Sequence, residues 1–151
     1  MIRAVWIFAL SFVGVFIVDQ NIKNLFLDGY IYDSSCITFA LTLNKGVAFS
    51  MLSSLGKDLK YIQIALVIAV VAYLFYKKDI FVKYSLPLGL LFGGGCSNIY
   101  DRFIHGGVVD YVYWHCGFDF AIFNFADVVI DISVAIIFFL SYLKREKTSS
   151  D

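Results

Sequence analysis

Four long apolar runs divide the chain, at about residues 4–23, 61–76, 84–100 and 126–143. A bilayer core of about 30 Å is crossed by roughly 20 mostly apolar helical residues. The pattern therefore predicts four transmembrane helices, which together with short connections account for most of the 151 residues. The first run lacks a small-residue cleavage site and continues directly into DQNIK, so we interpret it as a retained helix.

Two of the connecting segments carry β-strand patterns. Residues 37–44, ITFALTLN, alternate apolar and polar side chains at period two, and a turn sequence, NKG, separates them from VAFS, which predicts a hairpin. Residues 108–114 and 118–125 are rich in aromatic and β-branched side chains. We therefore expect a small β platform, built from about residues 30–50 and 108–125, on the outer membrane surface with its aromatic rings among the lipid headgroups.

Composition agrees with a membrane protein. The chain is 60% hydrophobic and 19% aromatic, and its 16% of charged residues is well below the roughly 25% of a soluble domain. The formal net charge is zero, so nothing indicates a nucleic-acid partner, and membrane lipids are the expected surroundings. The predicted fold class is an all-α membrane core of four transmembrane helices with a small extracytoplasmic β platform, in a single domain covering residues 1–151.

The basic side chains predict the orientation of this domain. They gather before the first apolar run, between the second and third, and after the fourth, at Arg3, Lys77, Lys78, Lys83, Lys144, Arg145 and Lys147. Because cytoplasmic connections carry an excess of Lys and Arg, we expect both termini to be cytoplasmic and the β platform to lie outside. Residues 144–151 are expected to form a disordered tail.

Aspartates gather near the predicted outer ends of the apolar runs, at Asp19, Asp101, Asp110, Asp127 and Asp131. A carboxylate inside a span costs about 2.5–3.5 kcal/mol, so each needs a reason to be there. Two carboxylates held close in a poorly solvated place share a proton and can act as general acid and base. Two other functions would use the same residues: a carrier or channel for ions, and an assembly subunit that needs them only for folding.

Structural interpretations of the individual aspartates remain open. Asn124 can cap the fourth helix, and Asp127, three residues later, would then complement the helix N-terminus. Asp131 lies one turn further on the same face, where it can contact a neighbouring helix. Asp19 and Lys23 have the i, i+4 spacing of a supportive ion pair.

The cysteines and glycines carry less information. Cys36, Cys96 and Cys116 lack CxxC spacing, and a disulfide between Cys36 and Cys116 stays open. Together with the two histidines they match no zinc pattern, so we expect neither a metal nor another cofactor. The triple glycine at 93–95 does not continue into a phosphate loop, which favours close helix packing in lipid.

Two motifs together carry a family resemblance. GGGCSNIYDRFIHGGVVDY, residues 93–111, and FNFAD, residues 123–127, resemble the patterns GGxxGNxxDRxxxGxVxDF and FNxAD of the bacterial lipoprotein signal peptidase family, also called signal peptidase II. The upstream DQNIK and NKGVAFS are similar to the family's DxxxK and NxGxAF. The matching positions include Asp19, Lys23, Asn44, Gly94, Asn98, Asp101, Arg102, Asp110, Asn124, Ala126 and Asp127.

The resemblance implies a membrane-embedded aspartyl endopeptidase that removes the signal peptide from a diacylglyceryl-modified prolipoprotein, cutting just before the lipidated cysteine. Its catalytic pair would be Asp110 and Asp127, and the other matched residues would bind substrate or support the site. It also implies a multi-pass protein of the bacterial cytoplasmic (inner) membrane, with the active site at the extracytoplasmic face. The chain departs from the family pattern at four positions outside the pair, which are Ser97, Tyr111, Ala121 and Ser133.

Overall fold

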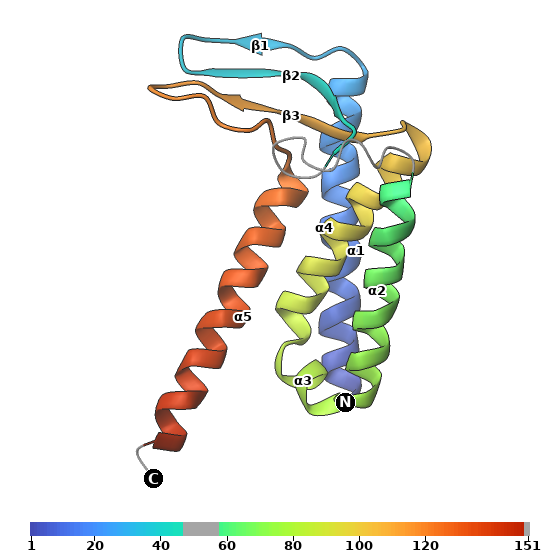
Figure 1. The fold of residues 1–151 in the computed structure, drawn as a ribbon, viewed down its shortest axis with the longest axis vertical. Coiled ribbons are helices and arrows are strands. Elements are labelled where there is room, and N and C mark those ends of the chain that lie inside the picture. The colour runs from blue at the N-terminus through green and yellow to red at the C-terminus, as the bar shows by residue number, and fades with distance from the viewer. Residues whose placement is uncertain (47–57, 150–151) are drawn as a thin grey trace.

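A computed structural model describes residues 1–46 and 58–149 of the chain (Figure 1). Helices and strands follow one another in the order α1 (Ile2–Leu27), β1 (Tyr32–Asp33), β2 (Ile37–Asn44), α2 (Leu59–Tyr76), α3 (Lys78–Lys83), α4 (Ser85–Ile104), β3 (Val108–Trp114) and α5 (Phe125–Ser149). Each predicted apolar run is therefore helical. The sheet lies across one end of the helices, and the N-terminus and the far end of α5 lie toward the other end (Figure 1).

The chain is a mostly helical membrane protein. Three of its described helices are long and apolar enough to cross a bilayer, namely α1, α2 and the Phe125–Leu143 part of α5. Large apolar side chains on the outer surfaces of these helices are exposed, as in Leu10 (69%), Phe75 (74%) and Phe138 (71%). Exposure of this kind suits contact with lipid tails, because a continuous apolar surface in water is rare on a soluble monomer.

Three helices, α1, α4 and α5, extend beyond their predicted C-terminal boundaries, and α4 ends at Ile104. Helix α1 runs to Leu27, and its last turns contain the Asp19–Lys23 pair, whose i, i+4 spacing supports a helix. Helix α5 continues to Ser149, through most of the segment predicted to be a disordered tail. The segment begins with KREK, residues 144–147, and these strong helix formers do not end the helix.

Within the described residues, the β platform is a three-stranded antiparallel sheet in the order β1-β2-β3. The strand predicted at 37–44 is confirmed, and it pairs with β1 on one side and with β3 on the other, where Thr42 lies opposite Asp110. The predicted second strand of the hairpin begins at VAFS, residues 47–50, which lie outside the described residues. The pairing with β3 is long-range, and it brings Asn44 beside the strand that carries Asp110.

The strand predicted at 118–125 is wrong. This segment contributes a single bridge, between Val112 and Phe123. Gly117 adopts a positive φ of 81°, which turns the backbone after β3, and helix α5 already begins at Phe125. Between this turn and the helix, only Phe123 forms a bridge to β3.

Helix α4 packs closely against α1 and α5, through two glycines of the triple. A Cβ atom on Gly93 would lie 2.7 Å from the backbone oxygen of Phe12, and one on Gly94 would lie 3.0 Å from that of Ala126. The close-packing interpretation of these glycines is thus confirmed, whereas Gly95 has nothing within 4 Å. This packing brings the polar end of α4 against the neighbouring helices.

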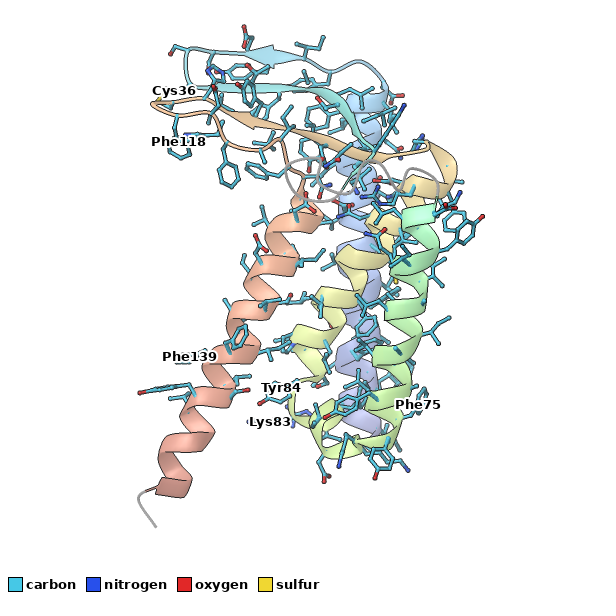
Figure 2. The ribbon with its side chains drawn as sticks, in the orientation of Figure 1. Cys36, Phe75, Lys83, Tyr84, Phe118 and Phe139 are labelled. Carbon is cyan, nitrogen blue, oxygen red and sulfur yellow. A yellow bond between two sulfur atoms is a disulfide. The ribbon has the colours of Figure 1, made fainter. Side chains whose placement is uncertain are left out.

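A disulfide joins Cys36, just before β2, to Cys116, just after β3. Figure 2 shows Cys36 at the end of the strands that lies away from the helices α1 and α4. Cys96, on α4, is a free cysteine. The open question of the cysteine pairing is therefore answered in favour of a cross-linked platform.

Candidate active site

Buried polar side chains gather where α1, α4 and α5 meet β3. They include Asp19, Lys23, Ser97, Asn98, Asp101, Arg102, Asp110 and Asn124. Four elements far apart in the sequence thus bring together most of the residues singled out by the motifs. Burying so many polar groups is costly unless each has a partner, and almost all of them do.

Asp110 lies in β3 and is 2% exposed. Its Oδ1 accepts a hydrogen bond from Asn124 Nδ2 at 2.7 Å, and its Oδ2 accepts one from Asn44 Nδ2 at 2.9 Å. Burial raises the pKa of Asp110 to about 6, with a smaller contribution from the nearby charge of Asp127, while the two asparagine hydrogen bonds oppose this rise. The pKa of Asp110 therefore lies nearer to neutral pH than that of an ordinary aspartate, so this group can both take up and release a proton there.

Asp127 lies in the first turn of α5 and forms a reciprocal cap with Asn124. The backbone N–H of Asp127 donates to Asn124 Oδ1 at 2.9 Å, and the backbone N–H of Asn124 donates to Asp127 Oδ2 at 3.1 Å. The capping interpretation is confirmed, because both hydrogen bonds of a helix capping box are present. The other oxygen, Oδ1, accepts from Asn98 Nδ2 at 2.9 Å.

Asn124 connects the two carboxylates. Its Nδ2 donates to Asp110 Oδ1, and its backbone N–H donates to Asp127 Oδ2. The same Nδ2 also lies 3.1 Å from Asn98 Oδ1. One fully buried residue therefore fixes the position of Asp110 relative to Asp127.

Lys23 lies at the centre of a second, deeper cluster. Its Nζ lies 2.6 Å from Asp19 Oδ2, 2.6 Å from Asp101 Oδ2 and 2.7 Å from Asn98 Oδ1. A lysine ammonium has three donors, so all of them are used here. The i, i+4 pair expected for Asp19 and Lys23 is confirmed, with Asp101 as an additional partner.

The two deep carboxylates also hold the backbone next to the candidate catalytic pair. Asp101 Oδ2 accepts from the N–H of Val109, the residue before Asp110, at 3.1 Å. Asp19 Oδ1 accepts from the N–H of Ala126, the residue before Asp127, at 2.9 Å. Each deep aspartate therefore positions the chain immediately before one aspartate of the pair.

Some contacts were not anticipated from the sequence. Gln20 Nε2 donates to Ser97 Oγ and to Asp101 Oδ1, both at 2.8 Å, and Ser97 Oγ donates to Asp19 Oδ2 at 2.7 Å. Tyr111 OH accepts from the N–H of Phe125 at 2.9 Å. Ser97 and Tyr111, two departures from the family pattern, are thus part of the network. No motif marked Gln20, and its only signal was its place beside Asp19.

Arg102 and Asp131 lie at the edge of this arrangement. Arg102 Nη1 lies 3.5 Å from the backbone oxygen of Asn44, and its Nη2 donates to the backbone oxygen of Gly46. It therefore holds the end of β2, where Asn44 Oδ1 also accepts from the Gly46 N–H. Asp131 is exposed, and within the described part of the chain it makes no hydrogen bond or ion pair, so the helix contact suggested for it is not found there.

The site thus presents two carboxylates, with amide donors on all four oxygens. Each oxygen of an ionised carboxylate has two lone pairs, so one per oxygen remains for a water molecule or a proton. Among residues 1–46 and 58–149, no group of three His, Cys, Asp or Glu side chains is arranged to hold a metal ion. The chemistry that this geometry supports directly is proton transfer between a carboxyl pair, water and a substrate.

Comparison with known proteins identifies the family to which the chain belongs. A sequence model of the family described as signal peptidase (SPase) II matches residues 11–143, a range that contains every residue of the network. The chain belongs to the signal peptidase II family. The resemblance drawn from the motifs is therefore confirmed, and membership assigns the chain to the peptidases.

Individual members of the signal peptidase II family are similar along nearly the whole chain. A lipoprotein signal peptidase from Sulfurimonas denitrificans is 57% identical over 141 residues, which cover 93% of this chain and 91% of that protein. One from Helicobacter pylori strain P12 is 49% identical over 142 residues, covering 91% and 90%. The similarity therefore extends over the helices as well as the motifs.

Two solved structures of bacterial membrane enzymes share the fold. One superposes with a TM-score of 0.75 at 29% identity and covers 94% of this chain and 90% of its own. The other has a TM-score of 0.70 at 30% identity and covers 86% and 88%. The helical arrangement described above is thus also found in experimentally determined membrane enzymes.

Proposed function

We propose that this protein is an aspartyl endopeptidase that removes the signal peptide from diacylglyceryl-modified prolipoproteins, cutting just before the lipidated cysteine. The observation that carries the proposal is the linkage of Asp110 and Asp127 through the single residue Asn124. Relatives that are 57% and 49% identical are lipoprotein signal peptidases, which supports this substrate class.

Amide hydrolysis needs an activated water, a stabilised oxyanion and a proton for the departing nitrogen. In the proposed mechanism the ionised member of the pair takes a proton from water while the protonated member donates to the scissile carbonyl oxygen. As the C–N bond breaks, the aspartate that took the proton from water passes it to the departing nitrogen, and a hydroxyl group of the tetrahedral intermediate returns a proton to the other aspartate. The two groups titrate as a unit, so these roles belong to the pair. Burial is the main cause of the raised pKa of Asp110, and the charge of Asp127 adds to it, which agrees with two carboxyl groups close enough to interact.

The remaining matched residues are proposed as supports of the pair. Asn98 and Asn44 each donate to one aspartate of it, and Arg102 holds the end of β2. Lys23 would act through Asn98. Gly94 allows the start of α5 to approach α4 closely, and the same packing holds Ala126. The deep aspartates Asp19 and Asp101 position the backbone, as described above.

In the proposed topology α4 also crosses the inner membrane, as the third of four transmembrane helices in chain order, and α5 is the fourth. Both termini are then cytoplasmic and the sheet is extracytoplasmic. Helix α4 has 20 residues, which correspond to about 30 Å of helix. The distribution of basic residues supports the orientation. The Cys36–Cys116 disulfide also supports it, since disulfides persist in oxidising compartments. The signal helix and acyl chains of the substrate would then stay in lipid while water reaches the cut bond from outside.

The proposal is tested with Asp110→Asn and Asp127→Asn, which keep the side-chain shape and remove the acid. Each variant, reconstituted with a diacylglyceryl-modified prolipoprotein, should lose at least about 100-fold in cleavage rate. Asp131→Asn is the matched control, because Asp131 is an exposed acid on the same helix and should retain activity. Mass spectrometry of the product should find the lipidated cysteine at its N-terminus. A folded Asp110 or Asp127 variant that cleaves at the wild-type rate would refute the assignment.

A further inference from the structure

A cavity of about 550 Å³ lies between α1, α2 and α3, at the end of the helices away from the sheet. Its walls are mostly apolar and include Val5 of α1, Leu74 of α2 and Phe81 of α3. Figure 2 shows Phe75, another lining residue, at this end of α2. The volume falls within the range of about 300–1,000 Å³ that is typical of small-molecule sites. The proposed peptidase mechanism makes no use of it.

Among the described residues that line the cavity, Lys78 has the only charged side chain, and Met1 adds the ammonium group of the chain terminus. The Lys78 side chain is exposed, and within residues 1–46 and 58–149 it makes no ion pair or hydrogen bond. The neighbouring lysines differ, because Lys77 Nζ lies 4.8 Å from the ring centre of Tyr76 and Lys83 Nζ donates to Tyr84 OH at 2.8 Å. The apolar cavity therefore has a cationic side chain, Lys78, at its edge that no described residue neutralises.

We propose that this cavity binds an acyl chain of an anionic phospholipid from the surrounding leaflet, with Lys78 contacting the phosphate headgroup. Apolar cavities stay free of water, whereas a hydrocarbon chain matches the lining. Lysines near the ends of spanning helices extend toward the headgroup layer, where the phosphates lie. The basic residues of this end outnumber its acidic ones, with Arg3, Lys77, Lys78 and Lys83 against Asp79, so an anionic headgroup is favoured over a zwitterionic one.

The test uses the purified, delipidated protein in a neutral detergent, titrated with palmitoyl-oleoyl phosphatidylglycerol or phosphatidylcholine. A ligand that binds the folded state raises the melting temperature, so saturable stabilisation reports binding. Phosphatidylglycerol should stabilise the wild type more than phosphatidylcholine does. Lys78→Gln should weaken phosphatidylglycerol binding about fivefold. Lys77→Gln, which removes the same charge one residue away and outside the lining, should retain most of the wild-type affinity.

A second set of variants tests the cavity itself. Val5→Trp and Val71→Phe each place a larger side chain in the lining and should abolish saturable stabilisation by phosphatidylglycerol. Retained prolipoprotein cleavage shows that a variant is folded. The proposal is overturned if phosphatidylcholine stabilises the wild type equally, if Lys78→Gln binds as the wild type does, or if a folded cavity-filling variant still binds.

Discussion

Lys23 Nζ donates a hydrogen bond of 2.7 Å to Asn98 Oδ1, and the lysine is only 1% exposed. Because an ammonium group can only donate, this contact sets the orientation of the Asn98 amide. Its Nδ2 then faces Asp127 Oδ1, at 2.9 Å. Lys23 therefore acts on one proposed catalytic carboxylate through an intermediate side chain, and not by direct contact.

Replacing Lys23 by methionine should destabilise the protein strongly. Asp19 and Asp101 are both fully buried, and each would lose the one cation that pairs with it within residues 1–46 and 58–149. Removing one partner of a buried ion pair costs about 3–5 kcal/mol in the free energy of unfolding. Thermal unfolding in detergent measures the loss. Lys77→Met, at an exposed lysine, is the control and should stay within about 0.5 kcal/mol of wild type. Equal melting temperatures for the two variants would contradict the central role of Lys23.

Cleavage should fall as the pH is lowered through about 6, the value to which burial raises the pKa of Asp110. In the proposed mechanism the pair already shares one proton, so protonation of Asp110 leaves no ionised member to activate water. Asn44 donates to Asp110 Oδ2 and stabilises the ionised form. Asn44→Ala should therefore move the acidic limb of kcat/KM upward by about one pH unit.

Histidine side chains titrate in the same range and need a control. The double variant His105→Asn/His115→Asn should keep the wild-type acidic limb, because neither residue contacts Asp110 in the described network. Asp110 is ruled out as the origin of the acidic limb of kcat/KM if that limb disappears in the histidine double variant. It is also ruled out if Asn44→Ala does not shift the limb.

The sequence could identify the motif residues as candidate site residues because each belongs to a short local pattern, as Asp127 does with Asn124. Period two at residues 37–44 likewise predicted β2, since one strand carries its own alternation. Its pairing with β3 could not be read from the sequence, because that pairing joins Thr42 to Asp110 across a long stretch of chain. The contacts of Gln20 and Ser97 were missed for the same reason, as they depend on how α1 and α4 pack.

Two neighbouring glycines of α4 should respond oppositely to alanine. A Cβ on Gly93 would lie 2.7 Å from the Phe12 backbone oxygen and 3.0 Å from Val15 Cβ, so α1 would have to move. Gly93→Ala should therefore lower the stability by about 1–3 kcal/mol. Gly95 has nothing within 4 Å, and Gly95→Ala should raise stability by roughly 0.5–1 kcal/mol through helix propensity. Similar melting temperatures for the two variants would contradict the packing of α4 on α1.

The Cys36–Cys116 disulfide should contribute to stability, because it closes a loop with a sequence separation of 80 residues. Its loss should cost about 2–4 kcal/mol. Dithiothreitol should lower the melting temperature of the wild type to that of the Cys36→Ser/Cys116→Ser variant and should leave the variant itself unchanged. Cys96 is present in both proteins, so its reactions cancel in the comparison.

The same disulfide tests which side of the membrane the sheet occupies. In intact spheroplasts, a membrane-impermeant reductant followed by an impermeant maleimide should label Cys36 and Cys116 only if the sheet is extracytoplasmic. A Cys96→Ser background confines the label to these two residues, since Cys96 is the free cysteine. Labelling without the reductant would show that the disulfide does not form. Labelling that requires opened cells would reverse the proposed topology, because the sheet carries Asp110 and the active site must lie on the same side as β3.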